Sequence, residues 1–172
     1  MKPGRATLEI GAGCLRNARW LMARGVSVDV TEDKGTITKY AKHYDDFQRT
    51  GGGVFDETWP NKRYDVIVST FVLGVLTSKG SRLHLLRQAR SRMKERGIFL
   101  LSVRGPGDVK TKTRKGRPWR DGFVTSNGTF IKPFRRSELV CIVECAGLAV
   151  HPLVPQFASN SGVVDLILVR ES

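Results

Sequence analysis

The sequence predicts a single-domain α/β fold built on a mostly parallel β-sheet. Residues 7–32 (TLEIGAGCLRNARWLMARGVSVDVTE) have the pattern of a strand, a glycine turn, a helix and a second strand, which is one βαβ unit. Residues 64–76 (YDVIVSTFVLGVL) and 98–104 (IFLLSVR) are nearly continuous apolar runs, as expected for parallel strands that are covered on both faces. A chain of 172 residues with 40% hydrophobic content is long enough for one sizeable core.

The first βαβ unit carries the most informative residues. Its first strand (7–10) leads into the glycine turn 11–13 and a helix, and its second strand spans 26–31. Glu9 stands just before the glycines, and Glu32 stands just after the second strand. Ligands of open parallel sheets bind outside the carboxyl ends of the strands, where glycine admits close approach and an acid accepts hydrogen bonds from ribose hydroxyls. We therefore expect a cofactor that contains a nucleoside.

The glycine turn distinguishes between two classes of cofactor. A dinucleotide-binding turn has a third glycine where this chain has Arg16. The pattern E-x-G-x-G from Glu9 to Gly13 instead resembles motif I of the class I S-adenosylmethionine-dependent methyltransferases, in which the acid lies near the methionine moiety of the cofactor. The third glycine that is common in that family is replaced here by Leu15.

Two further stretches resemble the same family. Residues 64–76, the helix that follows them and the segment 95–104 (ERGIFLLSVR) match its pattern, so the resemblance covers nearly the whole chain up to residue 104. It implies a Rossmann-like, mostly parallel seven-stranded sheet with an antiparallel last strand, helices on both faces and S-adenosylmethionine as the cofactor. It places Asp56 and Glu57 near the adenine and Ser69 and Thr70 near the methyl group. The implied cofactor-binding residues are Glu9, Gly11, Ala12, Gly13, Glu32, Asp33, Asp56, Glu57, Ser69 and Thr70.

Direct displacement of the methyl group from a sulfonium requires alignment and exclusion of water rather than a fixed catalytic side chain. No catalytic base stands out, because His43 and His84 lie on predicted helices and His151 lies on a late strand. No proline follows Ser69, which disfavours methylation of the amino group of a flipped DNA base.

No metal-ligand spacing is present. The cysteines are expected to be small buried residues in a reducing compartment: Cys14, Cys141 and Cys145.

The remaining elements follow from hydrophobic periods and turn residues. The helix that begins near residue 81 should end at Gly97, and Ser137 should cap the last helix. The predicted elements are helices at 33–50, 81–96 and 137–147 and strands at 54–55, 148–154 and 163–169. The charged residues of the helix predicted at 81–96 are expected to face largely outward: Arg82, Arg87, Arg90, Arg92 and Lys94.

A basic insert follows the fifth strand at residues 105–133. Its first part, 105–122, is almost without apolar residues, which predicts a mobile loop. Asn127-Gly128 between two apolar runs predicts a β-hairpin over 123–132. We expect this insert to be a substrate arm whose cations meet phosphates and whose tryptophan stacks on a base, the alternative being a disordered surface loop. The candidate substrate-binding residues are Lys110, Lys112, Arg114, Lys115, Arg117, Trp119 and Arg120.

A net charge of +13 and an isoelectric point near 10.2 also favour a nucleic-acid partner, although a solvated basic surface is the alternative. Residues 121–139 (DGFVTSNGTFIKPFRRSEL), together with residues 71–76 (FVLGVL), resemble methyltransferases associated with bacterial DNA phosphorothioation, and this resemblance keeps DNA-linked biology among the expected functions. No apolar run approaches the roughly 20 residues that span a bilayer, so we expect a cytoplasmic protein without a membrane partner. We expect no substrate-covering lid before the first strand, which leaves room for a homodimer in which one subunit covers the other's site.

Two other functions remain open from the sequence. A noncatalytic relative would bind the cofactor, or only nucleic acid, and Leu15 together with the missing lid favours that alternative. A nicotinamide oxidoreductase is disfavoured by Arg16 and by the lack of a Tyr/Lys or His/Asp dyad at the strand ends.

Overall fold

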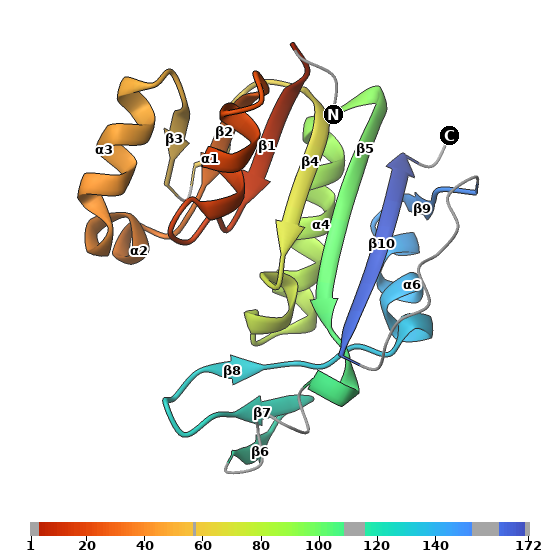
Figure 1. Ribbon diagram of the computed structural model, residues 1–172. Helices are drawn as coiled ribbons and strands as arrows, with labels where there is room; N and C mark the ends of the chain where they lie inside the picture. The colour runs from red at the N-terminus through yellow and green to blue at the C-terminus, as the bar shows by residue number, and fades with distance from the viewer. Residues whose placement is uncertain (1–3, 57, 109–115, 153–161, 171–172) are drawn as a thin grey trace. The chain divides into compact units, whose positions relative to one another are not determined.

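The computed structural model describes residues 4–56, 58–108, 116–152 and 162–170. Figure 1 shows its elements. The larger sheet contains β1 (Ala6–Ile10), β2 (Ser27–Thr31), β3 (Gly53–Phe55), β4 (Tyr64–Thr70), β5 (Met93–Arg104), β9 (Leu148–Val150) and β10 (Val163–Arg170). The smaller sheet contains β6 (Arg117–Trp119), β7 (Gly122–Val124) and β8 (Phe130–Ile131). The helices are α1 (Arg16–Met22), α2 (Lys34–Lys39), α3 (Ala41–Arg49), α4 (Lys79–Arg92), α6 (Arg136–Glu144) and the 3₁₀ helix η1 (Leu73–Val75).

The order of the strands confirms the predicted fold class. The seven strands of the larger sheet lie in the order β3-β2-β1-β4-β5-β10-β9, and the three short strands lie in the order β6-β7-β8. The pairs β1–β2 and β2–β3 are parallel, whereas β10 is antiparallel to both β5 and β9. No helix within the described ranges is long and apolar enough to cross a bilayer.

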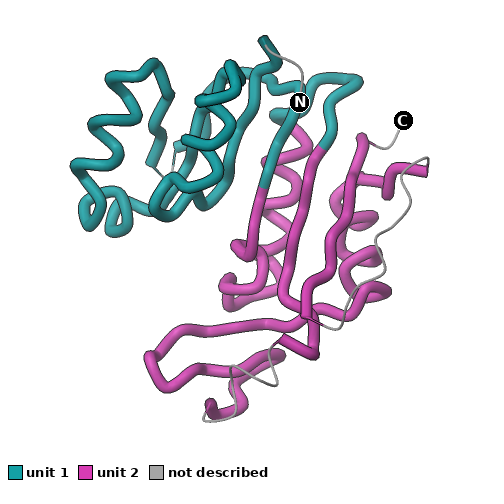
Figure 2. The backbone as a smooth tube through the Cα atoms, viewed as in Figure 1, with its two compact units in different colours: residues 1–68, 92–98 teal, residues 69–91, 99–172 magenta. Residues whose placement is uncertain are grey.

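The chain divides into two compact units, which Figure 2 shows in different colours. The first unit comprises residues 1–68 and 92–98, and the second comprises residues 69–91 and 99–172. Both β4 and β5 therefore contribute residues to each unit.

Strand register in the first unit aligns three strand ends at one edge. Ile10 of β1 lies opposite Thr31 of β2, and Thr31 lies opposite Phe55 of β3. Because these strands are parallel, the residues that follow them leave the sheet at the same edge, where ligands of open α/β sheets bind. These following residues are Gly11, Glu32 and Asp56.

The core of the first unit explains why its helices form. The apolar residues of α1 and α3 recur at helical spacing, so each helix has one side that can be buried against the strands. Helix α1 lies against β2, and α3 lies near β3. The buried cluster contains Ala12, Leu15, Ala18, Leu21, Val26, Val28, Val30, Tyr44 and Phe47.

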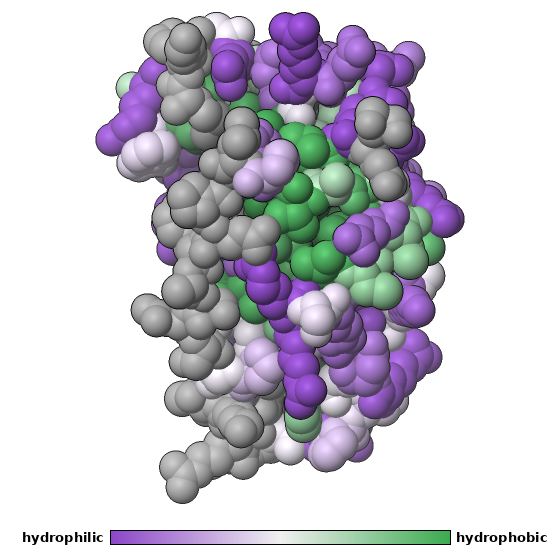
Figure 3. Space-filling model, turned by 90° about the vertical axis from the view of Figure 1, so that its right-hand side faces the viewer, coloured by the Kyte–Doolittle hydropathy of each residue, from purple (hydrophilic) through white to green (hydrophobic). Residues whose placement is uncertain are grey.

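In the second unit, β5 and β10 bury one face more completely than the other. Leu101 lies opposite Leu166 on the buried face, and Leu100 lies opposite Ile167 on the half-buried face. Alternation of this kind is expected of strands with one well-covered side. Figure 3, which views the molecule from the side of β9 and β10, shows an apolar patch among hydrophilic residues.

The boundary between α4 and β5 differs from the prediction. The sequence predicts a helix to residue 96 that is ended by Gly97, but β5 already begins at Met93. A Cβ atom at Gly97 would lie 2.9 Å from the backbone oxygen of Tyr64. Glycine therefore permits close approach of two backbones inside a strand here, and it does not end a helix.

The strand predicted over 64–76 is also shorter than expected. It ends at Thr70 because Phe71 adopts a φ of 66°, in the left-handed region, and η1 follows. An apolar run alone does not distinguish a strand from the buried turn that continues it.

The last helix departs from the prediction at its start. Arg135 is the N-cap of α6 and no side chain caps the helix, so Ser137 is not the cap. The predicted strand 148–154 corresponds to β9, and its residues 153 and 154 lie outside the described residues.

The prediction of buried cysteines is wrong. All three are exposed, because other residues of α6 form its buried side and Cys14 lies on the open glycine turn: Cys14, Cys141 and Cys145.

Arg82 of α4 is buried rather than outward-facing, with 2% of its surface exposed. Its guanidinium donates two hydrogen bonds to the carboxylate of Asp121, between β6 and β7, and Nε donates to the oxygen of Leu76 at 2.9 Å. The rings of Phe130 and Phe134 flank the guanidinium carbon at 5.9 and 5.8 Å. The helical period could not predict this burial, because the covering residues come from a separate segment.

Residues 117–131 of the insert form a three-stranded sheet where the sequence predicts the end of a loop and a hairpin. The predicted hairpin is confirmed by the pairing of β7 with β8, and Gly128 in its turn has a φ of 77°. Residues 117–119, predicted to lie in a mobile loop, form β6 and pair with β7. The remainder of that predicted loop includes residues 109–115, which lie outside the described residues.

We predict that Asp121→Asn destabilises the protein, because the buried charge of Arg82 loses its counter-charge. Breaking a fully buried ion pair costs about 3–5 kcal/mol, and since Asp121 is 47% exposed we expect about 2 kcal/mol. Urea unfolding at pH 7 measures this loss. The matched control is Asp46→Asn, which breaks an exposed pair with Arg49 and should cost less than about 0.5 kcal/mol. Equal effects of the two substitutions would contradict the prediction.

Candidate functional site

The glycine turn after β1 is held by backbone hydrogen bonds. The N–H groups of Gly11 and Ala12 donate to the oxygen of Thr31 at 2.8 and 3.4 Å. Gly11 and Gly13 have φ values of 69° and 56°, which glycine adopts without steric cost. A Cβ atom at Gly13 would meet nothing within 4 Å, so the space beside the turn is open.

Leu15 occupies the position of the missing third glycine, and its φ of 64° is also left-handed. This conformation costs a non-glycine residue on the order of 1–2 kcal/mol. The side chain is fully buried in the core of the first unit, and burying a leucine contributes about 1.5–3 kcal/mol. Core packing therefore offsets the backbone strain, and the turn keeps the left-handed geometry despite the substitution.

Glu9 lies at the end of β1 with only 2% of its surface exposed. Its Oε1 accepts a hydrogen bond from Nδ2 of Asn17 at 2.9 Å. Its Oε2 is buried and has no hydrogen-bond partner within the described part of the chain. Burial raises the pKa of Glu9 above its ordinary value, and the hydrogen bond from Asn17 only partly opposes this. A buried carboxylate oxygen without a hydrogen-bond partner reduces the stability of the fold. A ligand that donates a hydrogen bond to this oxygen would remove that cost.

The carboxylate of Glu32 binds the turn from the end of β2. Its Oε2 accepts from the N–H of Gly13 at 2.6 Å, and its Oε1 accepts from the N–H of Asp33 at 2.9 Å. The hydroxyl of Tyr44 donates to the carbonyl oxygen of Gly13 at 2.8 Å. Burial raises the pKa of Glu32 and of Tyr44. A carboxylate has about four acceptor positions, so Glu32 can hold the turn and still accept hydrogen bonds from ribose hydroxyls.

Two aspartates complete the acidic edge of the first unit. Asp33 is the N-cap of α2 and accepts from the N–H of Thr36 at 2.9 Å. Asp56 accepts from the N–H and hydroxyl of Thr58 at 3.2 and 3.0 Å. Hydrogen bonds from these threonines lower the pKa of both aspartates, so both stay ionised. Glu57 lies outside the described residues.

In the second unit, residues at the ends of β4 and β5 form a separate group. The Oγ of Ser69 is buried and has no partner among the described residues, and Thr70 is half-buried. The strained Phe71 donates its N–H to the oxygen of Ser102 at 2.8 Å. The guanidinium carbon of Arg104 lies 4.5 Å from the centre of the Phe71 ring. A bulky residue with positive φ at a strand end is a frequent mark of a functional site.

The insert presents three of its predicted substrate-binding residues. Trp119 is 40% exposed, and its ring meets that of Phe130 edge-on at 5.4 Å. The guanidinium of Arg120 lies 4.4 Å from the Trp119 ring centre, and its Nη1 donates to the oxygen of Thr77 at 3.2 Å. Arg117 is exposed. The remaining predicted residues lie outside the described residues: Lys110, Lys112, Arg114 and Lys115.

The structure thus brings Glu9, the glycine turn and Glu32 together within the first unit. Sequence reasoning missed Asn17, and it assigned Tyr44 only to the core. The position of Asn17 in the first turn of the helix that follows the glycine turn was the signal that could have predicted its contact with Glu9. The hydroxyl of Tyr44 reaches the turn only through tertiary packing, which the sequence does not show. Among the described residues, no three His, Cys, Asp or Glu side chains lie together as metal ligands. Of the three histidines considered as bases, His43 and His84 are exposed and His151 is half-buried.

Comparison with known proteins identifies the family. The sequence profile of the methyltransferase domain family matches residues 2–153. The chain belongs to this family, an enzyme class whose cofactor is S-adenosylmethionine. No curated protein sequence matches the chain.

Solved structures show the same fold. The chain is similar to the CcbJ methyltransferase from Streptomyces caelestis, with a TM-score of 0.75 and 17% identity over 98% of this chain and 84% of that one. It is similar to the glycopeptide N-methyltransferase MtfA in complex with S-adenosylmethionine, with a TM-score of 0.72 and 15% identity over 98% and 82%. It is also similar to the 1,6-didemethyltoxoflavin-N1-methyltransferase of Burkholderia thailandensis, with a TM-score of 0.73 and 17% identity over 99% and 72%.

We predict that Glu9→Gln flattens the pH dependence of stability. Because the pKa of Glu9 is raised in the folded state, the folded protein binds more protons than the unfolded chain above about pH 4.3. The wild-type free energy of unfolding therefore falls as the pH rises through the raised pKa. Glutamine removes this titration and keeps an acceptor for Asn17, so the variant should be at least as stable as the wild type at pH 7.

Chemical denaturation at intervals from pH 4.5 to 8 measures the effect as a difference between variant and wild type. The control is Glu144→Gln, which removes the same charge from an exposed position of α6 and should leave the curve unchanged. A loss of stability in Glu9→Gln at pH 7 would show that the carboxylate is a stabilising group.

Proposed function

We propose that this protein transfers a methyl group from S-adenosylmethionine to an acceptor by direct displacement. The observation that carries the proposal is the buried, unpartnered Oε2 of Glu9 beside an open glycine turn. Glu9 would hold the amino group of the methionine moiety, Glu32 the ribose hydroxyls and Asp56 the adenine amino group. The cofactor supplies a methyl group on a sulfonium, which is already an excellent leaving group.

The protein's own contribution is positioning. The turn is braced from two sides, by the carboxylate of Glu32 on the N–H of Gly13 and by the hydroxyl of Tyr44 on its carbonyl. A fixed turn holds a reactant in one geometry and reduces the entropy lost on reaching the transition state. In the second unit, Phe71 offers an aromatic ring at the end of β4, where an acceptor would be bound, and Arg104 beside it is ion-paired with Asp108.

For the acceptor, we propose nucleic acid bound by the insert. The support is the exposure of Arg117 and Trp119 together with the net charge of +13. The sequence resemblance of residues 121–139 to phosphorothioation-associated methyltransferases adds DNA to the acceptors that should be screened. Small molecules and peptides are the competing acceptor class, since similar structures include a glycopeptide N-methyltransferase and a didemethyltoxoflavin N1-methyltransferase.

We predict that the protein binds S-adenosylmethionine and its demethylated product but not NAD, as measured by calorimetric titration. Gly13→Arg should abolish binding because its side chain enters the open space beside the turn. Glu9→Gln should weaken binding about 10- to 100-fold, the value of a charged hydrogen bond. The control is Gly51→Arg, at another glycine with positive φ and nothing within 4 Å, which should bind normally.

Failure of the wild type to bind either sulfur ligand would refute the cofactor assignment. Binding without methyl transfer to any acceptor would favour the noncatalytic alternative.

We predict that tritium from labelled S-adenosylmethionine is transferred to DNA or RNA, and that Arg117→Gln/Arg120→Gln weakens binding of single strands. The salt dependence should also decrease, with the slope of log K against log salt falling by about 1.4 for two lost phosphate contacts. Lys39→Gln/Lys42→Gln removes the same charge from the first unit and is the control. Transfer only to small molecules or peptides, with an unchanged slope, would assign the acceptor to the competing class.

A further inference from the structure

The solvent side of α1 and of the turn that follows it carries three arginines and an exposed tryptophan. At 100° per residue, the exposed residues of this segment fall on one arc of the helix, opposite the buried side. No acidic residue interrupts α1. We call this surface the α1 face, and it consists of Arg16, Arg19, Trp20, Ala23 and Arg24.

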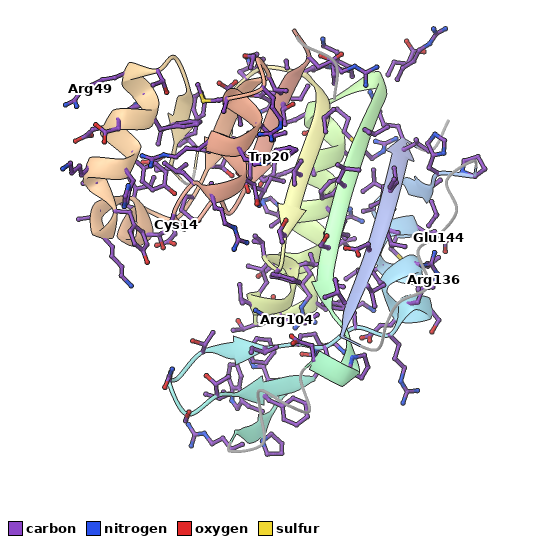
Figure 4. All side chains as sticks on the ribbon, viewed as in Figure 1. Cys14, Trp20, Arg49, Arg104, Arg136 and Glu144 are labelled. Atoms are coloured by element: carbon purple, nitrogen blue, oxygen red, sulfur yellow. The ribbon has the colours of Figure 1, made fainter. Side chains whose placement is uncertain are left out.

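Trp20 is the centre of the α1 face. It is 56% exposed, the most exposed large apolar side chain that the structure describes, and Figure 4 labels it on α1. The guanidinium carbon of Arg24 lies 3.8 Å from the Trp20 ring centre, and its Nη1 donates to the oxygen of Trp20 at 3.1 Å. Contacts with Arg24, which lies outside the core, therefore hold the indole in place. Core packing does not account for a tryptophan here, because the buried side of α1 is formed by other residues.

The same arrangement occurs in the second unit. There Trp119 is 40% exposed and the guanidinium of Arg120 lies 4.4 Å from its ring centre. Among the described residues, the exposed large apolar side chains are these two tryptophans and Val75. Each compact unit thus presents an indole to solvent with an arginine stacked on it.

The chemistry of the α1 face fits single-stranded nucleic acid better than a membrane. An interfacial helix inserts an apolar side into the bilayer, but Leu15, Ala18 and Leu21 are already buried in the core of the first unit. A single strand offers unstacked bases for an indole and phosphates for the arginines around it. The planar guanidinium of Arg24 suits both contacts, since it stacks on rings and donates to phosphate.

We propose that the α1 face binds single-stranded nucleic acid, with a base stacked on Trp20 and phosphates held by Arg16 and Arg24. This goes beyond the proposed function and does not rest on it, because binding here requires neither cofactor nor methyl transfer. The α1 face is also distinct from the insert, whose residues belong to the second unit.

Fluorescence anisotropy of labelled single-stranded DNA and RNA 15-mers without cofactor tests the proposal. Trp20→Ala should weaken binding about 5- to 100-fold, the range for loss of one stacked base, and Trp20→Phe should restore most of it. Arg24→Gln should lower the salt slope by about 0.7. The matched control is Arg49→Gln, on α3 in the same unit, which should leave affinity and slope unchanged. Circular dichroism and titration with S-adenosylmethionine check that each variant is folded.

Three outcomes would overturn the proposal. The first is unchanged nucleic-acid affinity in Trp20→Ala. The second is binding to vesicles of phosphatidylcholine and phosphatidylglycerol that depends on Trp20 while nucleic-acid binding does not. The third is loss of nucleic-acid binding in Trp119→Ala alone, which would leave the insert as the binding surface. Loss of nucleic-acid binding in Trp20→Ala, combined with methyl transfer by the wild type only to small molecules or peptides, would support the α1 face and refute only the nucleic-acid acceptor.

Discussion

The carboxylate of Glu32 joins the end of β2 to the glycine turn that follows β1, and the candidate cofactor site depends on this connection. Parallel pairing of β1, β2 and β3 in register makes it possible, because the chain leaves all three strands at one edge. The hydroxyl of Tyr44 fixes the opposite side of the same glycine. A turn of high conformational freedom thereby becomes a rigid support, which is what positional catalysis requires.

This support contains two features that reduce stability. Glu9 is buried with one oxygen unpaired, and Leu15 holds a left-handed backbone. In the proposed function a cofactor would supply the hydrogen-bond donor that Glu9 lacks, and the strain at Leu15 is compensated by its fully buried side chain. Retention of local strain where a ligand binds, with compensation from nearby packing, is typical of functional sites.

The second unit is organised around another buried charge. Arg82 lies between aromatic rings and binds Asp121, so the three-stranded insert is attached to α4 by a paired charge with flanking rings. An attached sheet presents its exposed arginines and tryptophan in defined positions. A free loop would have to lose conformational entropy to do the same on binding. The basic surface of the protein therefore has two structured components, the insert and the α1 face.

The sequence by itself determined the βαβ unit, the succession of the seven strands of the larger sheet, the family and the acids at the strand ends, but not the division of the predicted helix 33–50 into α2 and α3. These follow from local periodicity and from the glycine spacing, which short segments express without help from distant residues. Tertiary structure decided the burial of Arg82, the early start of β5 at Met93 and the partners of Glu9 and Glu32. Each depends on which residues from remote segments cover a given side chain, and a helical or alternating period carries no information about that covering.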